Sequence, residues 1–226
     1  MTLGPRVGIL GGTFDPVHVG HVATARASCH ALDLDRVLMV PSGTPPHRQQ
    51  PGVSRYHRFA MTALAVTGLD RLQVSDLEIG EEDSSYTYDT LLRLHARGLP
   101  ALQIFFITGA DAFAEIATWS RYPRVLDMAN FVVVSRPGHP VSALRAVLPS
   151  LAARMLDVER QSTNASEPRI HLLDAPTPDV SSTDIRRRLA DGGSISGMVP
   201  ESVCVYIGQH GLYTPADANV TGKSLA

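Results

Sequence analysis

The residues best suited to chemistry stand in one stretch, GGTFDPVHVGH, from Gly11 to His21. It follows a short apolar run, RVGIL, which predicts a β-strand. Two glycines directly after a strand let backbone N–H groups approach a ligand closely. His18 and His21 are three positions apart at the start of a helical stretch, so both imidazoles share one face beside the positive end of the helix dipole. The stretch therefore predicts a site for an anion whose charge grows during a reaction.

Other phosphate and metal patterns fit this stretch less well. It matches neither GxGxxG nor GxxxxGK[ST], the dinucleotide fingerprint and the Walker A loop. Metal binding by His18 and His21 is the alternative function, although no third ligand stands near them in the sequence. We therefore expect no metal site built from protein ligands.

A second polar stretch, VSSTDIR, ends at Arg186. Ser and Thr ahead of an amphipathic run predict a helix start, and Ser181 and Asp184 have the spacing of a loose capping box. Free amides, hydroxyl groups and the helix dipole would converge there on a phosphate. Arg186 is close enough to join as a bidentate donor, whereas Arg187 and Arg188 point elsewhere round the helix toward solvent.

Four shorter stretches carry weaker signals, each with a structural alternative. PPHR ends in two cationic donors, His47 and Arg48, but a rigid solvent loop would look the same. Thr87 has the position of an N-cap, and the amides beside it could take a carboxylate. Asp111 follows an apolar run and would either accept bonds from ribose hydroxyls or cap the next helix. Trp119 is the only tryptophan, so its indole either packs in the core or stacks on a flat cationic ring.

These stretches lie between segments that alternate in type. Nearly continuous apolar runs predict strands at Arg6–Leu10, Arg36–Val40, Leu72–Ser75, Gln103–Ile107, Asn130–Val134 and Arg169–Leu173. Amphipathic runs predict helices at about Gly20–Leu32, Arg55–Val66, Thr87–Arg97, Asp111–Ala117, Ser142–Met155 and Thr183–Ala190. The polar run Asp157–Pro168 predicts a surface loop. The alternation predicts an α/β fold in a single domain, a Rossmann-like doubly wound parallel sheet with helices on both faces and ligands at the carboxyl ends of the strands.

Composition narrows the class of protein. The 226 residues are 44% hydrophobic and 19% charged, which is globular and excludes a wholly disordered chain. A net charge of −2 argues against a general clamp on nucleic acid, so an anionic ligand needs a locally positive pocket. Two cysteines, Cys29 and Cys204, cannot form a disulfide framework. Without an apolar signal core, or a run near the roughly 18 apolar residues of a membrane span, we expect a cytoplasmic protein with no membrane association.

The two strongest stretches carry a family resemblance. GGTFDPVHVGH resembles the nucleotide-binding signature of the (H/T)xGH nucleotidyltransferase superfamily, and VSSTDIR resembles its (I/V)SSTx(I/L)R motif. PPHR, SYTYDTL and the lone tryptophan narrow the resemblance to the bacterial nicotinate-nucleotide adenylyltransferases. It runs from Val7 to Tyr213 and implies a nucleotidyltransferase domain over residues 1–213, followed by a polar, disordered tail over 214–226. The stretch His139–Pro168 departs from the family pattern.

The resemblance implies an enzyme of NAD biosynthesis. It would transfer the adenylyl group of ATP to nicotinate mononucleotide, giving nicotinate adenine dinucleotide and pyrophosphate. Mg²⁺ would enter with ATP, bound mainly by ligand oxygens and water. No nucleic acid is implied as a partner, and a homo-oligomer is left open.

The same resemblance assigns residues to each ligand. Catalytic roles fall to the histidines and the arginine of the strongest motifs, His18, His21 and Arg186. ATP would contact the glycine loop, the GxD pair and the serine-rich helix start, through Gly11, Gly12, Thr13, Phe14, His18, His21, Gly109, Asp111, Ser182, Thr183 and Arg186. Nicotinate mononucleotide would meet PPHR with its phosphate, the SYT amides with its carboxylate and the indole with its ring, through Ser42, His47, Arg48, Thr87, Tyr88, Asp111, Trp119 and Ser120. A further substrate contact is implied at Arg136, whose stretch VSRPG resembles the family's RPG segment beside the adenosine.

Three rival functions remain at this point. Another adenylyl or cytidylyl transferase of the same fold is opposed by the tryptophan and the SYT stretch. A nucleotide-sensing module without catalysis is opposed by the intact histidines and SSTxxR helix start. A nucleic-acid-binding protein would need a basic stripe, which a net charge of −2 disfavours.

Overall fold

The computed structural model describes residues 4–44, 51–80, 85–158 and 166–214. Within these ranges seven strands form one parallel sheet in the order β3-β2-β1-β4-β5-β7-β6. The strands are β1 Val7–Gly12, β2 Arg36–Pro41, β3 Leu72–Val74, β4 Ile104–Gly109, β5 Asn130–Val134, β6 Met155–Asp157 and β7 Ile170–Leu173. The predicted α/β fold with a parallel sheet is confirmed.

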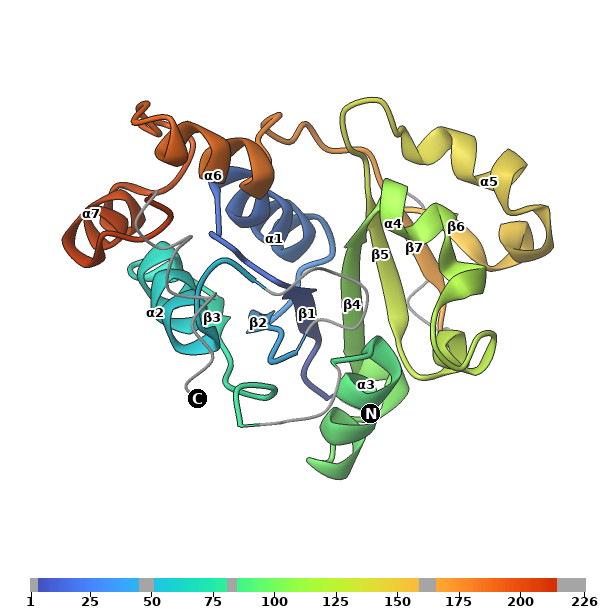
Figure 1. The fold of residues 1–226 in the computed structure, drawn as a ribbon. Helices are drawn as coiled ribbons and strands as arrows, with labels where there is room; N and C mark the ends of the chain where they lie inside the picture. The colour runs from blue at the N-terminus through green and yellow to red at the C-terminus, as the bar shows by residue number, and fades with distance from the viewer. Residues whose placement is uncertain (1–3, 45–50, 81–84, 159–165, 215–226) are drawn as a thin grey trace, which may run out of the picture.

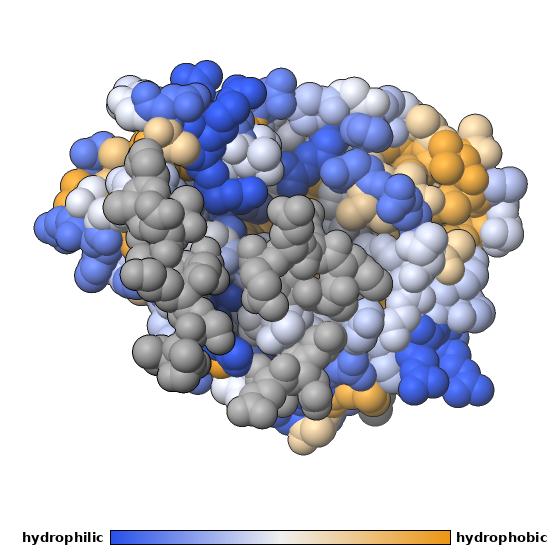
Figure 2. Space-filling model, in the orientation of Figure 1, coloured by the Kyte–Doolittle hydropathy of each residue, from blue (hydrophilic) through white to orange (hydrophobic). Residues whose placement is uncertain are grey.

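Helices cover both faces of the sheet, as predicted. The α-helices are α1 Val19–Ala31, α2 Arg55–Val66, α3 Thr87–Ala96, α4 Ala110–Ala114, α5 Leu144–Val147, α6 Ser182–Ala190 and α7 Glu201–His210. Short 3₁₀ helices are η1 Ala101–Gln103, η2 Ile116–Thr118, η3 Arg124–Asp127, η4 Val141–Ala143 and η5 Pro149–Arg154. Figure 1 shows α1, α2, α6 and α7 on one side of the sheet and α3, α4 and α5 on the other. The surface over α6 is mostly hydrophilic, whereas apolar side chains gather over α5 (Figure 2).

Alternation along the strands divides the core into two halves. On β4, Phe105 and Ile107 face the side of α1, whereas Ile104 and Phe106 face the side of α4. All four are nearly inaccessible to solvent. Burial on both faces is why the strands appear in the sequence as continuous apolar runs.

The chain order reverses between β1 and β4. From β1 the chain passes outward to β2 and β3, and it then returns to the other side of β1 as β4. Such a reversal opens a crevice at the carboxyl ends of the strands, where ligands bind in open α/β sheets. The loop from Gly11 to His18 and the turn from Gly109 to Asp111 both leave the sheet here. In the described ranges no helix has both the length and the apolar character to span a membrane.

The helix predicted at Ser142–Met155 is wrong. The stretch forms η4, α5 and η5 in succession, and Met155 opens strand β6. Pro149 explains the break, because it has no N–H to donate and disfavours helical geometry in the residue before it. Leu148 accordingly adopts φ −125° and ψ 64°.

The sequence also left one strand and one α-helix unassigned, along with the short helices η1 and η3. Strand β6 has only three residues, MLD, too few for a hydrophobic period to show. Helix α7 contains VCVYI, whose β-branched residues are equally typical of a strand. Asp157 thus ends a strand rather than opening the predicted loop Asp157–Pro168. Residues 159–165 of that loop, and 215–226 of the expected tail, lie outside the described ranges.

The close contact between β1 and its neighbours gives a stability prediction. A Cβ at Gly8 would lie 2.8 Å from Val37 Cγ2 and 2.9 Å from Leu34 Cδ1. Gly8→Ala should therefore overpack the core and lower the free energy of unfolding in urea by about 1–3 kcal/mol. Gly208→Ala in α7 is the matched control, because nothing lies within 4 Å of a Cβ there, and it should raise stability by about 0.5–1 kcal/mol. Equal effects of the two substitutions would contradict this packing.

Candidate active site

The two imidazoles after β1 are stacked on each other. The ring centroids of His18 and His21 lie 3.6 Å apart, and the Phe14 ring meets His21 edge-on at 4.9 Å. The backbone N–H of His18 donates to His21 Nδ1 over 3.2 Å. Because Nδ1 accepts, the hydrogen of a neutral His21 ring is on Nε2, which makes Nε2 a donor. The structure thus brings the predicted pair together and gives His21 a defined orientation.

His18 has more buried surroundings than His21. It is the N-cap of α1 and is only 3% exposed. Burial, and then the positive charge of Arg136, lower the pKa of His18 to about 4. His18 is therefore a neutral ring at pH 7, able to offer an anion a hydrogen bond but not a positive charge.

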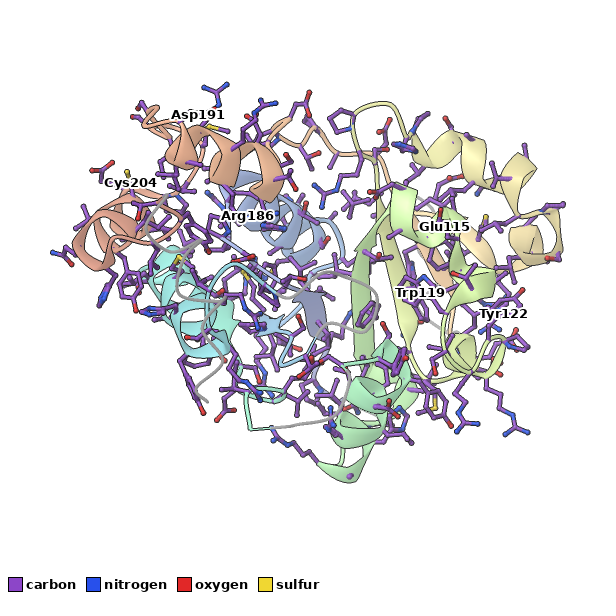
Figure 3. The ribbon with its side chains drawn as sticks, in the orientation of Figure 1. Glu115, Trp119, Tyr122, Arg186, Asp191 and Cys204 are labelled. Carbon is purple, nitrogen blue, oxygen red and sulfur yellow. The ribbon has the colours of Figure 1, made fainter. Side chains whose placement is uncertain are left out.

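The start of α6 lies against the loop after β1. Ser181 is its N-cap, as predicted. Ser182 Oγ donates to the Pro16 carbonyl over 2.9 Å, and Arg186 Nη1 donates to the Asp15 carbonyl over 2.7 Å. Segments 166 and 171 positions apart in the chain therefore meet. Figure 3 shows Arg186 below α6, beside α1. The two strongest motifs of the sequence form one site.

The other arginines of α6 face solvent, as predicted from the helical spacing. Arg187 and Arg188 both pair with Asp184 on the same helix, and their side chains are 71% and 52% exposed. Arg186 is thus the arginine of α6 that contacts the loop after β1.

A buried arginine that the sequence did not point to holds the same loop. Arg58 of α2 is 1% exposed, and its guanidinium donates to the carbonyl groups of Thr13 over 2.7 Å and Gly43 over 3.1 Å. A signal for it existed, because Arg58 stands three and seven positions before Met61 and Ala65 and so shares their buried face. Its charge, however, is typical of a solvated helix face.

Asp15 is a buried charge within the loop itself. Its side chain is 4% exposed and accepts from the Gly52 N–H and from the Tyr213 hydroxyl, each over 2.8 Å. Asp15 stands inside the strongest motif, yet its partner Tyr213 is 198 positions away, so no local pattern could reveal the contact.

Ser42 connects the glycine loop to the side predicted for the mononucleotide. Its backbone N–H donates to the Gly12 carbonyl over 2.9 Å. Its Oγ is buried and has no hydrogen-bond partner in the described part of the chain. His47 and Arg48, predicted for the mononucleotide phosphate, lie outside the described residues.

A cavity of about 390 Å³ lies beside the start of α3. Its wall combines that helix start with the segment after β4, through Ser85, Tyr86, Thr87, Ala112, Glu115, Thr118, Trp119 and Ser120. Three residues predicted for the mononucleotide, Thr87, Trp119 and Ser120, are thus brought together. The indole also meets Phe106 and Phe131 at centroid distances of 6.1 and 6.3 Å, so it both packs on the core and lines the cavity. Figure 3 shows Trp119 near Glu115, another residue of the cavity wall.

Some details of this cavity differ from the prediction. The N-cap of α3 is Tyr86, whose extended backbone ends the loop, and Thr87 is the first helical residue. Tyr88, one position further round the helix, packs against the core and is not part of the cavity wall. Glu115 and Thr118 complete the wall, although neither residue type marked them in the sequence.

A second cavity, of about 410 Å³, lies at the ends of β5 and β7. It is lined by Ser135, Arg136, Pro137, Asp174, Ala175, Pro176 and Thr177. Asp111 and Arg136, both predicted to contact ligands, approach Gly109. A Cβ on Gly109 would clash with Asp111 Oδ1 and lie 3.0 Å from Arg136 Nε. That Nε is buried without a hydrogen-bond partner among the described residues. Asp111 directly precedes Ala112, which lines the first cavity.

Sequence relatives match this chain over nearly their whole length. The model of the family described as cytidylyltransferase-like matches residues 9–188. A protein of Moorella thermoacetica named "Probable nicotinate-nucleotide adenylyltransferase" is 40% identical over 211 residues, which are 93% of this chain and 92% of that protein. A protein of the same name from Roseiflexus sp. is 42% identical over 214 residues, with 92% and 97% covered.

Solved structures share the fold. Nicotinic acid mononucleotide adenylyltransferase of Plasmodium falciparum, complexed with NaAD, matches with a TM-score of 0.73 and 17% identity, over 92% of this chain and 97% of that one. At this identity the likeness concerns the fold alone. The family model and the sequence relatives are the stronger finding: the chain belongs to the cytidylyltransferase-like family and, within it, to the nicotinate-nucleotide adenylyltransferases.

Proposed function

We propose that this protein transfers the adenylyl group of ATP to nicotinate mononucleotide, as an enzyme of NAD biosynthesis. The observation that carries the proposal is the contact of Ser182 and Arg186 with the loop that bears the stacked His18 and His21, in a sheet that has one cavity at the ends of β5 and β7 and another beside the start of α3. One cavity would take the adenosine and the other the pyridine ring, so that the phosphates meet between them. The names of relatives about 40% identical to this chain support the same reaction.

The reaction needs no nucleophile from the protein. An oxygen of the acceptor 5′-phosphate, ionised at pH 7, attacks the α-phosphorus of ATP and forms a new P–O bond. The bond between the α-phosphorus and the oxygen that bridges to the β-phosphate breaks, and its electron pair leaves on pyrophosphate. Catalysis then depends on holding two anions in line and on stabilising the charge that moves to the leaving group.

The loop after β1 and the start of α6 would stabilise that charge. His21 Nε2 would donate to the transferring phosphate, because the bond from His18 N–H to Nδ1 orients the ring. Thr13, which follows the two glycines at the end of β1, would hold the remaining phosphates together with Arg186, since the N–H groups of Gly11 and Gly12 belong to the sheet ladder. Ser182 would contribute its backbone N–H, since its hydroxyl already donates to the Pro16 carbonyl.

The cavity beside α3 would hold the acceptor. The indole of Trp119 would stack on the pyridinium ring, which favours a flat and electron-rich partner. The start of α3 at Thr87 carries the partial positive charge of the helix dipole, and this favours a carboxylate over a neutral carboxamide. We therefore propose nicotinate, rather than nicotinamide, mononucleotide as the preferred acceptor.

Mg²⁺ would reach the site bound to ATP. In the described ranges no group of three or more His, Cys, Asp or Glu side chains could hold a metal ion. The ligands of the ion would be triphosphate oxygens and water, and Arg186 and His21 would contact the same triphosphate. Bound there, Mg²⁺ would neutralise charge on the pyrophosphate.

Several expectations from the sequence stay predictions. They are a nucleotidyltransferase domain over residues 1–213 with a tail over 214–226, a cytoplasmic location and the absence of nucleic acid as a partner. A homo-oligomer also stays open.

A panel of substrates tests the reaction. With ATP and Mg²⁺ we expect pyrophosphate release on nicotinate mononucleotide and weaker release on nicotinamide mononucleotide. CTP as donor, or phosphopantetheine as acceptor, should give none, which separates this activity from the rival transferases. Binding of ATP without turnover on any acceptor would instead indicate a nucleotide sensor.

His21→Ala should act mainly on turnover. The donor matters most in the transition state, so kcat should fall about 10²–10³-fold while KM for ATP changes much less. His30→Ala is the matched control, because His30 is an exposed histidine at the other end of α1. Wild-type turnover in steady-state assays of His21→Ala would remove His21 from the reaction.

Trp119→Ala should act mainly on the acceptor. Loss of stacking should raise KM for nicotinate mononucleotide roughly tenfold and leave KM for ATP unchanged. Because the indole also packs on the core, Trp119→Phe and the thermal midpoint of each variant serve as controls, and Phe should retain part of the affinity. A lower midpoint with unchanged KM would assign the indole to the core alone.

A further inference from the structure

Asp15 joins four segments of the chain at one buried carboxylate. Oδ2 accepts from the Gly52 N–H and lies 3.7 Å from Arg186 Nη1, while Oδ1 accepts from the Tyr213 hydroxyl. The backbone carbonyl of Asp15 accepts from the same Arg186 Nη1 over 2.7 Å. Asp15 therefore links four parts of the chain: its own loop after β1, the segment before α2, the helix α6 and the turn that follows α7.

Tyr213 is built into this cluster rather than resting on its surface. It is 7% exposed, and its ring edge lies on Gly52, since a Cβ there would be 3.3 Å from Tyr213 Cε1 and 3.6 Å from Arg186 Cδ. Burial, and then the neighbouring Asp15 carboxylate, raise the pKa of the Tyr213 hydroxyl far above its usual range. The hydroxyl is therefore always protonated and is a permanent donor to Asp15.

Arg186 is held short of a full ion pair with Asp15. Its Nη1 donates to the Asp15 carbonyl, and its Nη2 lies 3.4 Å from Thr183 Oγ1. The 3.7 Å from Nη1 to Asp15 Oδ2 is longer than a hydrogen bond. The side chain is 35% exposed, so part of the guanidinium is open to a ligand. A carboxylate with an unfilled oxygen at this distance would draw Arg186 into a charge-assisted pair.

We propose that Tyr213 is a positioning residue for the triphosphate: its hydroxyl fills Asp15 Oδ1 and so leaves Arg186 available to ATP. The inference rests on the proposed function, in which Arg186 holds the phosphates of ATP. Without the hydroxyl, a buried carboxylate oxygen lacks a donor, and that cost is relieved when Arg186 turns to it. ATP must then break this pair before it can bind.

The test is Tyr213→Phe, which keeps the ring on Gly52 and removes only the donor. In steady-state assays KM for ATP should rise roughly tenfold, because a charge-assisted pair must be broken. KM for nicotinate mononucleotide should stay within about twofold of wild type, and kcat at saturating ATP within about threefold. A merely structural role would lower the thermal midpoint and the active fraction without raising KM for ATP relative to KM for nicotinate mononucleotide. An unchanged KM for ATP overturns the inference.

Tyr206→Phe is the matched control. Tyr206 lies on α7, and its hydroxyl contacts His57 Nδ1 over 3.0 Å, so the same atom is lost from the same face of the sheet away from Asp15. Both KM values should match those of wild type. The double variant Asp15→Asn with Tyr213→Phe removes the charge that captures Arg186, and it should bring KM for ATP back toward the wild-type value. A double variant worse than Tyr213→Phe would contradict the competition for Arg186.

Calorimetric titration with a non-hydrolysable ATP analogue separates this inference from the proposed function. If wild type binds the analogue but turns over no acceptor, the proposed function fails, and the dissociation constants still decide the role of Tyr213. An approximately tenfold weaker dissociation constant in Tyr213→Phe supports the inference. Equal constants in the two proteins overturn it, whatever the turnover.

Discussion

A loop that binds anions must show its amides to the ligand without also showing carbonyl oxygens, and this constraint governs the loop after β1. Three of its carbonyl groups, those of Thr13, Asp15 and Pro16, accept bonds from side chains outside the loop. Two of the donors are guanidinium groups, Arg58 from α2 and Arg186 from α6, and their bonds are stronger than neutral ones. The negative ends of these peptide dipoles therefore point toward donor groups of the protein and not toward a ligand.

Local dipoles, rather than net charge, suit this chain to two anionic substrates. The chain carries a charge of −2, His18 is neutral because its pKa is near 4, and Arg58 is spent on carbonyl groups. The starts of α1 and α6, with His21 and Arg186, lie at the loop after β1, and the start of α3 lines the acceptor cavity. Groups fixed in this way stabilise moving charge without reorganising, and they create no broad positive surface for nucleic acid.

The sequence predicts the parts of this fold in which local pattern and tertiary packing agree. The central strands, the stacked His18 and His21 and the capped start of α6 are such parts, because strand burial and helix starts leave marks within a few residues. The helix predicted at Ser142–Met155 fails at Pro149, which outweighs the apolar spacing around it. Buried Arg58 could not be predicted from its type, because its partners are carbonyl groups of distant loops.

Completion of the site depends on contacts between the two ends of the chain. Its defining bonds join residues 166 to 198 positions apart, from Pro16 and Asp15 at the start of the chain to α6 and Tyr213 near its end. The loop-closure entropy of such contacts is overcome only after the sheet has brought the strands together, so β1 to β7 provide the frame on which the end of the chain docks. Arg58 bonds the Thr13 carbonyl of the loop on which α6 and Tyr213 dock, whereas the wall of the acceptor cavity lies between Ser85 and Ser120. The contacts proposed for ATP and the wall of the acceptor cavity thus come from different parts of the chain, and this separation is the physical basis for the expected effects on ATP that spare the mononucleotide.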